Sequence, residues 1–254
     1  MKKLFASLVL VIACSGVFAQ ATKGKTAATK PSTAPAKQTP AQAQTPPATS
    51  VQGVIAEHFA RKYQIAQRWG DYEVAKDALY DLISDFPGND SLIFTLAYFY
   101  FDNQKYPSCA MVCNDLLARN SRNVAALELS GISYENLNIK DKALQNFESL
   151  FLLTNNNTTL YKMASLQYDL KRYQEVLINA DILLTKPEAD SLKVTFNDAQ
   201  GKPKEYPLRA ALLNLKGLTF KAQGDNVNAK KLFEDAIKVE PNFDPAKQNL
   251  ASLK

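Results

Sequence analysis

Apolar residues recur at three- and four-residue spacing along the chain from about residue 53 to the C-terminus. Short polar turns that contain Gly or Asn interrupt this pattern at regular distances. Such spacing is the period of an α-helix that buries one face, and Gly and Asn are favoured in the turns between helices. The pattern predicts an all-α region built from consecutive short helices.

The helical pattern repeats itself with a period of 34 residues. Two positions hold a small residue in four of the five copies, as is needed where antiparallel helices approach closely, and a third position holds an aromatic residue in three copies, where it fills the gap between the helices. The first copy departs from this pattern with Tyr63 at position 8. The small residues are Ala97, Gly131, Ala164 and Gly217 at position 8 and Ala75, Cys109, Ala143 and Ala229 at position 20, and the aromatic residues at position 11 are Tyr100, Tyr134 and Phe220. The sequence therefore predicts about five copies of one helical hairpin.

The last copy resembles the tetratricopeptide repeat (TPR) family. The residues that match the pattern of that family are Gly217, Phe220, Gly224, Asp225, Ala229, Phe233, Ala236, Pro241 and Asn242. The resemblance implies a TPR-type α-solenoid over residues 53–254, with one non-helical insertion and a C-terminal capping helix. We place the repeats at about 56–89, 90–123, 124–156, 157–190 and 210–243, the insertion at 191–208 and the cap at 244–254. The fourth copy is shifted by one residue, with Val176 at position 20.

The insertion has a pattern of its own. Polar and apolar residues alternate from Lys193 to Phe196, and Pro203 and Pro207 exclude a helix between them. We expect a short β-hairpin or flap that projects from the solenoid. An insertion of this length in a compact array is either functional or a tolerated decoration.

The first residues of the chain are typical of a secretory leader. Lys2 and Lys3 precede an apolar run, and Ala19 ends it at a small residue, so we predict a signal peptide over residues 1–19. A second interpretation stays open, because the residues up to Cys14 resemble a bacterial lipobox, which would make Cys14 a lipidated N-terminus. Residues 20–52 consist almost wholly of Ala, Thr, Pro, Lys, Gln and Ser, which predicts a disordered linker.

The charge of the chain is unevenly placed. The formal net charge is +5, but residues 1–50 hold six Lys and no acidic residue, so residues 51–254 carry 24 basic and 25 acidic groups. A nucleic-acid-binding domain concentrates its cations on the folded surface. We therefore expect no nucleic-acid partner.

Few residues could carry chemistry. His58 is the only histidine, and no phosphate-binding loop, paired-carboxylate motif or metal-spaced Cys/His cluster occurs. Cys109 and Cys113 lie four residues apart at core positions, which favours two small buried side chains. We predict no enzyme activity, no catalytic residues, no cofactor and no metal.

The TPR resemblance also implies a binding surface. In that family the first helices of the hairpins line a concave groove, with positions 2, 5, 9 and 12 facing it. Aromatic residues at several of these positions suit a protein or peptide partner, since each ring buries a large area at low entropy cost. The other interpretation is that these rings pack against the next helix or the insertion. The predicted groove residues are Phe94, Tyr98, Phe101, Glu128, Ile132, Tyr161, Tyr168 and Leu218.

These observations lead to one expected function and one alternative. We expect an exported, non-enzymatic scaffold or adaptor of the bacterial cell envelope or periplasm, with a protein or peptide partner and no integral membrane segment after the leader is removed. The alternative is a glycan-binding protein, or an accessory subunit of an envelope enzyme or of an outer-membrane assembly complex. Membrane contact is expected only if Cys14 is lipidated.

Overall fold

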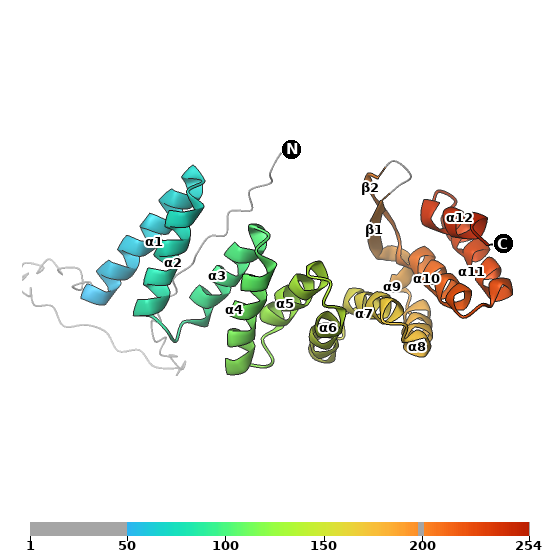
Figure 1. The fold of residues 1–254 in the computed structure, drawn as a ribbon, viewed down its shortest axis with the longest axis horizontal. Coiled ribbons are helices and arrows are strands. Elements are labelled where there is room, and N and C mark those ends of the chain that lie inside the picture. Colours follow the sequence, from blue (N-terminus) through green and yellow to red (C-terminus); the bar gives the residue numbers. More distant parts are fainter. Residues whose placement is uncertain (1–49, 198–200, 254) are drawn as a thin grey trace, which may run out of the picture. The chain divides into compact units, whose positions relative to one another are not determined.

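The computed structural model describes residues 50–197 and 201–253 (Figure 1). Within them, consecutive helices pack as five hairpins, a further helix follows the last hairpin, and one two-stranded sheet lies between the fourth and fifth. The predicted all-α array, with its capping helix and its single non-helical insertion, is confirmed. The predicted signal peptide, with Ala19 and Cys14, lies outside the described residues, as does almost all of the predicted linker.

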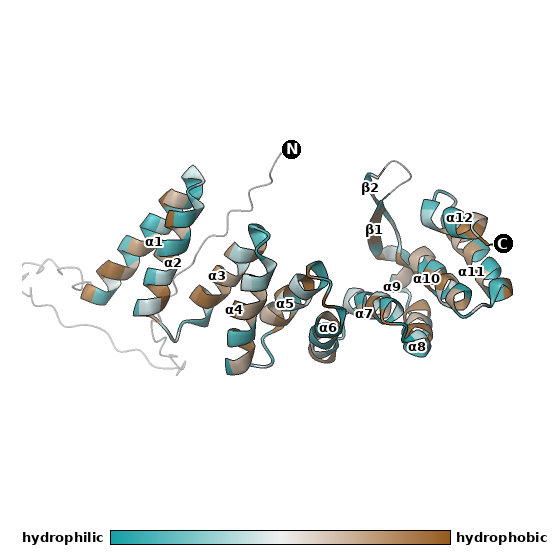
Figure 2. Ribbon diagram, in the orientation of Figure 1, coloured by the Kyte–Doolittle hydropathy of each residue, from teal (hydrophilic) through white to brown (hydrophobic). Residues whose placement is uncertain are grey.

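Each hairpin pairs two helices of 12 to 19 residues. Hydrophilic and hydrophobic residues both occur along these helices (Figure 2), and the buried apolar residues form clusters between neighbouring helices. The five pairs are α1 (Val51–Trp69) with α2 (Tyr72–Asp85), α3 (Asp90–Asp102) with α4 (Tyr106–Arg119), α5 (Val124–Asn136) with α6 (Lys140–Thr154), α7 (Asn157–Asp169) with α8 (Tyr173–Leu184), and α10 (Leu208–Ala222) with α11 (Asn226–Val239).

The turn inside each hairpin has the same backbone geometry. One residue in each turn has a positive φ, between 56° and 85°, and it stands one or two residues after the last residue of the first helix. These residues are Gly70, Gln104, Asn138, Lys171 and Gly224. The first three are 34 residues apart and Lys171 comes 33 after Asn138, so the one-residue shift of the fourth copy is confirmed.

Side chains cap the starts of several helices. The Ser50 hydroxyl accepts a hydrogen bond from the Gly53 N–H at 3.1 Å, and this cap starts α1 at Val51. The predicted linker, 20–52, therefore runs two residues into a helix. Asp71, Asn89, Asn123, Asn156 and Asp225 cap their helices in the same way.

The insertion is a β-hairpin, as predicted. β1 (Lys193–Asn197) pairs antiparallel with β2 (Pro203–Pro207), with Val194 opposite Tyr206. The one-turn helix α9 (Glu188–Ser191) precedes it, and α10 already begins at Leu208, the last residue of the predicted insertion.

One face of the hairpin is covered by the array, although most of its described residues are exposed. Val194, Phe196 and Tyr206 share one face of the two strands, and this face packs against the end of the array. Tyr206 is 1% exposed, and its ring lies 4.8 Å from that of Phe243, directly before the C-terminal helix α12 (Asp244–Ala251). The alternation of polar and apolar residues that predicted the strands thus also places the apolar side chains on one face, and that face packs against the array.

Candidate functional site

The first helices of the hairpins carry the predicted binding residues. These helices also contact one another along the array, α3 with α5 and α7 with α10. Residues at equivalent positions on α3 and α5, and on α7 and α10, therefore lie on adjoining surfaces.

Helix α3 contributes three aromatic residues that we call the α3 aromatic stripe: Phe94, Tyr98 and Phe101. Their spacing of four and three residues places them on one side of the helix. Phe94 and Phe101 are half-buried against a core cluster that includes Leu129 of α5, and Phe101 also meets the Tyr106 ring edge-on at 5.7 Å. Tyr98 is 44% exposed. The stripe is thus anchored at both ends and open in the middle.

Helix α5 supplies a carboxylate and an apolar side chain to the same surface. Glu128 is exposed and has no ion-pair partner among the described residues. Ile132, one turn further on, is half-buried against the core formed with α6 and α7. The Lys162 ammonium of α7 donates to Glu135 Oε2 at 3.0 Å and so ties the two first helices together.

Tyr161 and Tyr168 of α7 are less accessible than the prediction assumed. Tyr161 packs against the helical core and also against Val194 and Tyr206 of the inserted hairpin, and this burial raises the pKa of its hydroxyl far above the usual range. Tyr168 lies beside Tyr173, with ring centroids 6.1 Å apart, and its pKa is raised mainly by burial. Of the two interpretations that the sequence left open, the second therefore holds for Tyr161: its ring packs against the insertion.

The structure therefore divides the predicted residues into two groups. Tyr98 and Glu128 are exposed, whereas Phe94, Phe101, Ile132, Tyr161, Tyr168 and Leu218 are half-buried. The first group can meet a partner directly, and the second holds the helices at the spacing that presents the first.

A recess on the first hairpin was not predicted. It has a volume of about 440 Å³ and is bordered by Trp69, the only tryptophan of the chain, which is 74% exposed. The residues that line it are His58, Arg61, Lys62, Ile65, Ala66, Trp69, Asp71 and Val74. An exposed Trp at the end of an amphipathic helix is the signal in the sequence that could have indicated this surface.

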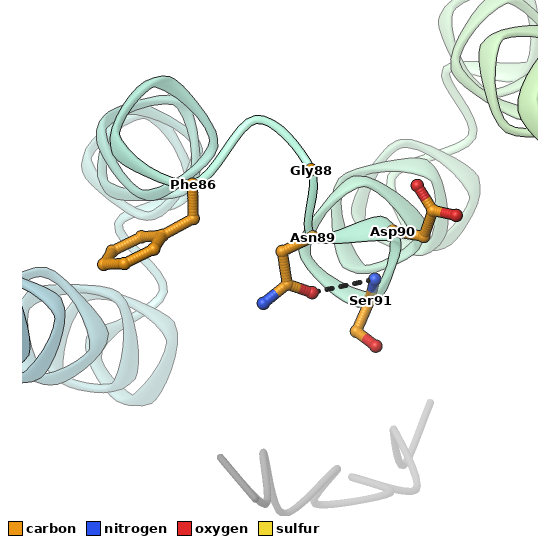
Figure 3. Close-up of a pocket in the computed structure, with 5 residues that line it drawn as sticks. All are labelled: Phe86, Gly88, Asn89, Asp90 and Ser91. Atoms are coloured by element: carbon orange, nitrogen blue, oxygen red, sulfur yellow. Dashed lines mark hydrogen bonds between the residues drawn. The ribbon is translucent and has the colours of Figure 1, made fainter. Parts of the chain in front are cut away.

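A second recess lies at the turn between α2 and α3 (Figure 3). Its volume is about 470 Å³, and Phe86, Gly88, Asn89, Asp90 and Ser91 line it. The Asn89 side chain already accepts hydrogen bonds from the Ser91 and Leu92 N–H groups, at 3.0 and 3.3 Å. The side-chain oxygen of Asn89, which borders this recess, is therefore already used to cap the N-terminus of α3.

The two cysteines are core residues, as predicted. Cys109 and Cys113 are fully buried and free, and they pack with Ala97 and Leu129. The hydrogen bond between the thiols raises the pKa of Cys113, while the pKa of Cys109 is lowered by Cys113 and then by Ser133. A thiol without access to solvent cannot attack a substrate.

No group of three or more His, Cys, Asp or Glu in the described part of the chain could hold a metal ion. None of the described helices combines the length and the apolar character that a membrane span requires.

No protein-family model matches the sequence, and no curated protein matches it significantly. Solved structures match the fold. A structure of MamA has 13% identity and a TM-score of 0.58, with 74% of this chain and 93% of that chain covered. A tetratricopeptide repeat protein from Parabacteroides merdae has 18% identity and a TM-score of 0.60, with 79% and 73% covered. YrrB, a TPR protein with an unusual peptide-binding site, has 11% identity and a TM-score of 0.60, with 79% and 98% covered. These likenesses show that the chain has the TPR fold.

Proposed function

We propose that the chain is a non-enzymatic scaffold that binds a protein or peptide partner on the surface formed by α3, α5 and α7. The observation that carries this proposal is the α3 aromatic stripe, in which the exposed Tyr98 lies along the helix between two half-buried rings. A tyrosine side chain has only two χ angles, so it gives up little conformational entropy when a partner covers it, and its hydroxyl can hydrogen-bond at the same time.

Glu128 adds a charge to this surface. Its carboxylate has no cation paired with it among the described residues, so a donor from the partner can approach it without displacing an internal ion pair. The TPR fold supports the proposal at the level of the fold, and YrrB, with a peptide-binding site of its own, is an example of such use.

The partner is best sought in the cell envelope. We propose that the leader over residues 1–19 directs export, with cleavage after Ala19, and that the protein acts in the periplasm or at the membrane. The mass of the mature N-terminal peptide tests this: a chain that begins at Gln20 supports soluble export, an acylated Cys14 would show a lipoprotein, and an intact Met1 would contradict export altogether.

A photo-crosslinking amino acid placed at position 98 tests the binding surface. In cells, the Tyr98 variant should give one dominant adduct with a partner, and Glu128→Gln in the same chain should weaken that adduct. The matched control places the same photo-crosslinker at Leu152, an 85% exposed side chain on α6. Equal adducts from positions 98 and 152, or none from position 98, would contradict the proposal.

Glycan binding is the weaker candidate. It requires the flap and the groove tyrosines to reach a glycan, whereas Tyr206 of the flap is buried and Tyr161 packs in the same cluster. No specific observation in the described residues favours it.

A further inference from the structure

The two ends of the repeat array differ in whether a further helix covers the end hairpin. At the C-terminal end, α12 covers the last hairpin, with Ala246 fully buried and Lys247 and Gln248 facing outward. At the N-terminal end, the outer side of α1 shows Val54, His58, Ile65 and Trp69 along one face, and nothing else in the described part of the chain packs over it. Each repeat in such an array buries its side against a neighbour, so an end without one exposes apolar area.

We propose that this α1 face, with its recess, is one half of a two-fold interface between two copies of the chain. The proposal does not depend on the partner-binding surface, because the two share no residue.

Self-complementarity is the reason for choosing a second copy. An interface with two-fold symmetry brings the same patch of both copies together, so the patch must hold both a protrusion and a recess. The α1 face holds both: the Trp69 side chain is largely exposed, and four side chains of the same helix line half of the recess beside it, namely His58, Arg61, Lys62 and Ile65.

The charges of the face allow this arrangement. Arg61 is paired with Glu57 at 2.6 Å, and Lys62 is paired with Asp77 at 2.6 Å and with Asp81 at 3.3 Å, so the patch carries little unbalanced charge. Two identical patches can therefore meet without strong repulsion.

Helix geometry then specifies one pair of contacts. If two α1 helices cross antiparallel at Ile65, residues equally far from Ile65 on either side face each other. Trp69 of one copy then faces Arg61 of the other, since both lie four residues, or about 6 Å, from the crossing point. An Arg guanidinium over an indole face is a favourable contact, and the symmetry forms it twice.

The C-terminal end offers no equivalent surface. Its outer residues on α12 are polar, so a second copy would gain little apolar contact by stacking its α1 face there. One helix face is smaller than a standard stable interface of about 800 Å² per partner, so we expect association in the range of roughly 1–100 μM.

Sedimentation velocity and Trp69 fluorescence on the full-length mature chain test the proposal. Both are measured from about 1 to 300 μM. The expected result is a monomer–dimer equilibrium, with a blue shift of the Trp69 emission at the same midpoint. A monomer at every concentration, or an emission that does not change as dimers form, would overturn the proposal.

Matched variants locate the interface. Val74→Asp keeps the fluorescent Trp69 and should weaken dimerisation at least tenfold, as should Trp69→Ala by sedimentation. The control is Val227→Asp, which changes an 82% exposed valine on α11 and should dimerise like the unchanged chain. Circular dichroism and thermal melting confirm folding of each variant. Dimerisation that is unaffected by both Val74→Asp and Trp69→Ala overturns the proposal, and the crosslink from position 98 is expected to stay the same in every case.

Discussion

Positions 8 and 24 of the hairpin share one space, so the residue at one limits the size of the residue at the other. A Cβ added at Gly217 would lie 2.5 Å from the Phe233 ring, and one added at Gly131 would lie 3.0 Å from the Phe147 ring. In the second hairpin the pair is Ala97 with Cys113, both fully buried. Cys113 is explained by this pairing, because a smaller residue is needed where position 8 has a methyl group.

The pairing predicts that Gly217→Ala destabilises the protein, although alanine is the better helix former. Overpacking a core costs about 1–3 kcal/mol, whereas Gly→Ala in a helix gains only about 0.5–1 kcal/mol. Urea unfolding should give a lower free energy of unfolding for Gly217→Ala than for the unchanged chain. Gly131→Ala is the matched comparison and should lose less, since its ring contact is longer. A gain in stability from Gly217→Ala would show that the Phe233 ring moves aside freely.

Tyr206 joins the inserted hairpin to the end of the array. Its ring meets both Phe196 and Phe243, and Lys204 lies over the other side at 5.1 Å. Its hydroxyl is buried and has no hydrogen-bond partner in the described part of the chain. A buried hydroxyl without a partner costs about 1–3 kcal/mol.

We therefore expect Tyr206→Phe to raise the free energy of unfolding by about 1 kcal/mol. Tyr206→Ala should lower it by about 3–5 kcal/mol, because the ring contacts are lost and a cavity remains. Chemical denaturation of the two variants separates the hydroxyl from the ring. Equal losses from both variants would show that the hydroxyl takes part in a favourable interaction.

Asp190 and Arg209 hold the base of the same hairpin. The Arg209 guanidinium donates to both carboxylate oxygens of Asp190, with 3.0 Å between Nη2 and Oδ2, and links α9 to α10. This hydrogen bonding lowers the pKa of Asp190 from its ordinary value of 3.8.

A lowered pKa means that the carboxylate stabilises the fold above its ordinary pKa and ceases to do so as the pH falls through the lowered value. The melting temperatures of the unchanged chain and of Asp190→Asn should therefore differ at pH 7 and converge as the pH falls from 3.8 through the lowered pKa. Asp181→Asn is the control for loss of another exposed, paired aspartate. A difference that persists unchanged at low pH would contradict this role for the ion pair.

At the scale of the whole molecule, the periodic parts could be predicted from the sequence and the non-periodic contacts could not. The same helix–helix contact recurs in each repeat. Small buried residues such as Ala75 and Ala229 therefore indicate that contact independently in different copies. The burial of Tyr161 depends on Val194 and Tyr206, which come from a single insertion with no second copy for comparison. The α1 face was missed because the 34-residue pattern shows which residues pack inside a hairpin and not whether another element covers its outer side.

A deletion at the C-terminal end of the array should destabilise the neighbouring repeats more than the distant ones. Deleting residues 244–254 removes α12 and exposes Phe243 and Ala236, which lie in one cluster with Tyr206. In an array whose repeats contact mainly their neighbours, the loss should stay near the deleted end. Hydrogen exchange should therefore quicken in α10, α11 and the β-hairpin while α3 to α6 keep their protection. Equal loss of protection in α3 would show that the array unfolds as one cooperative unit, in which case the open α1 face and the covered C-terminal end would stabilise each other through every repeat between them.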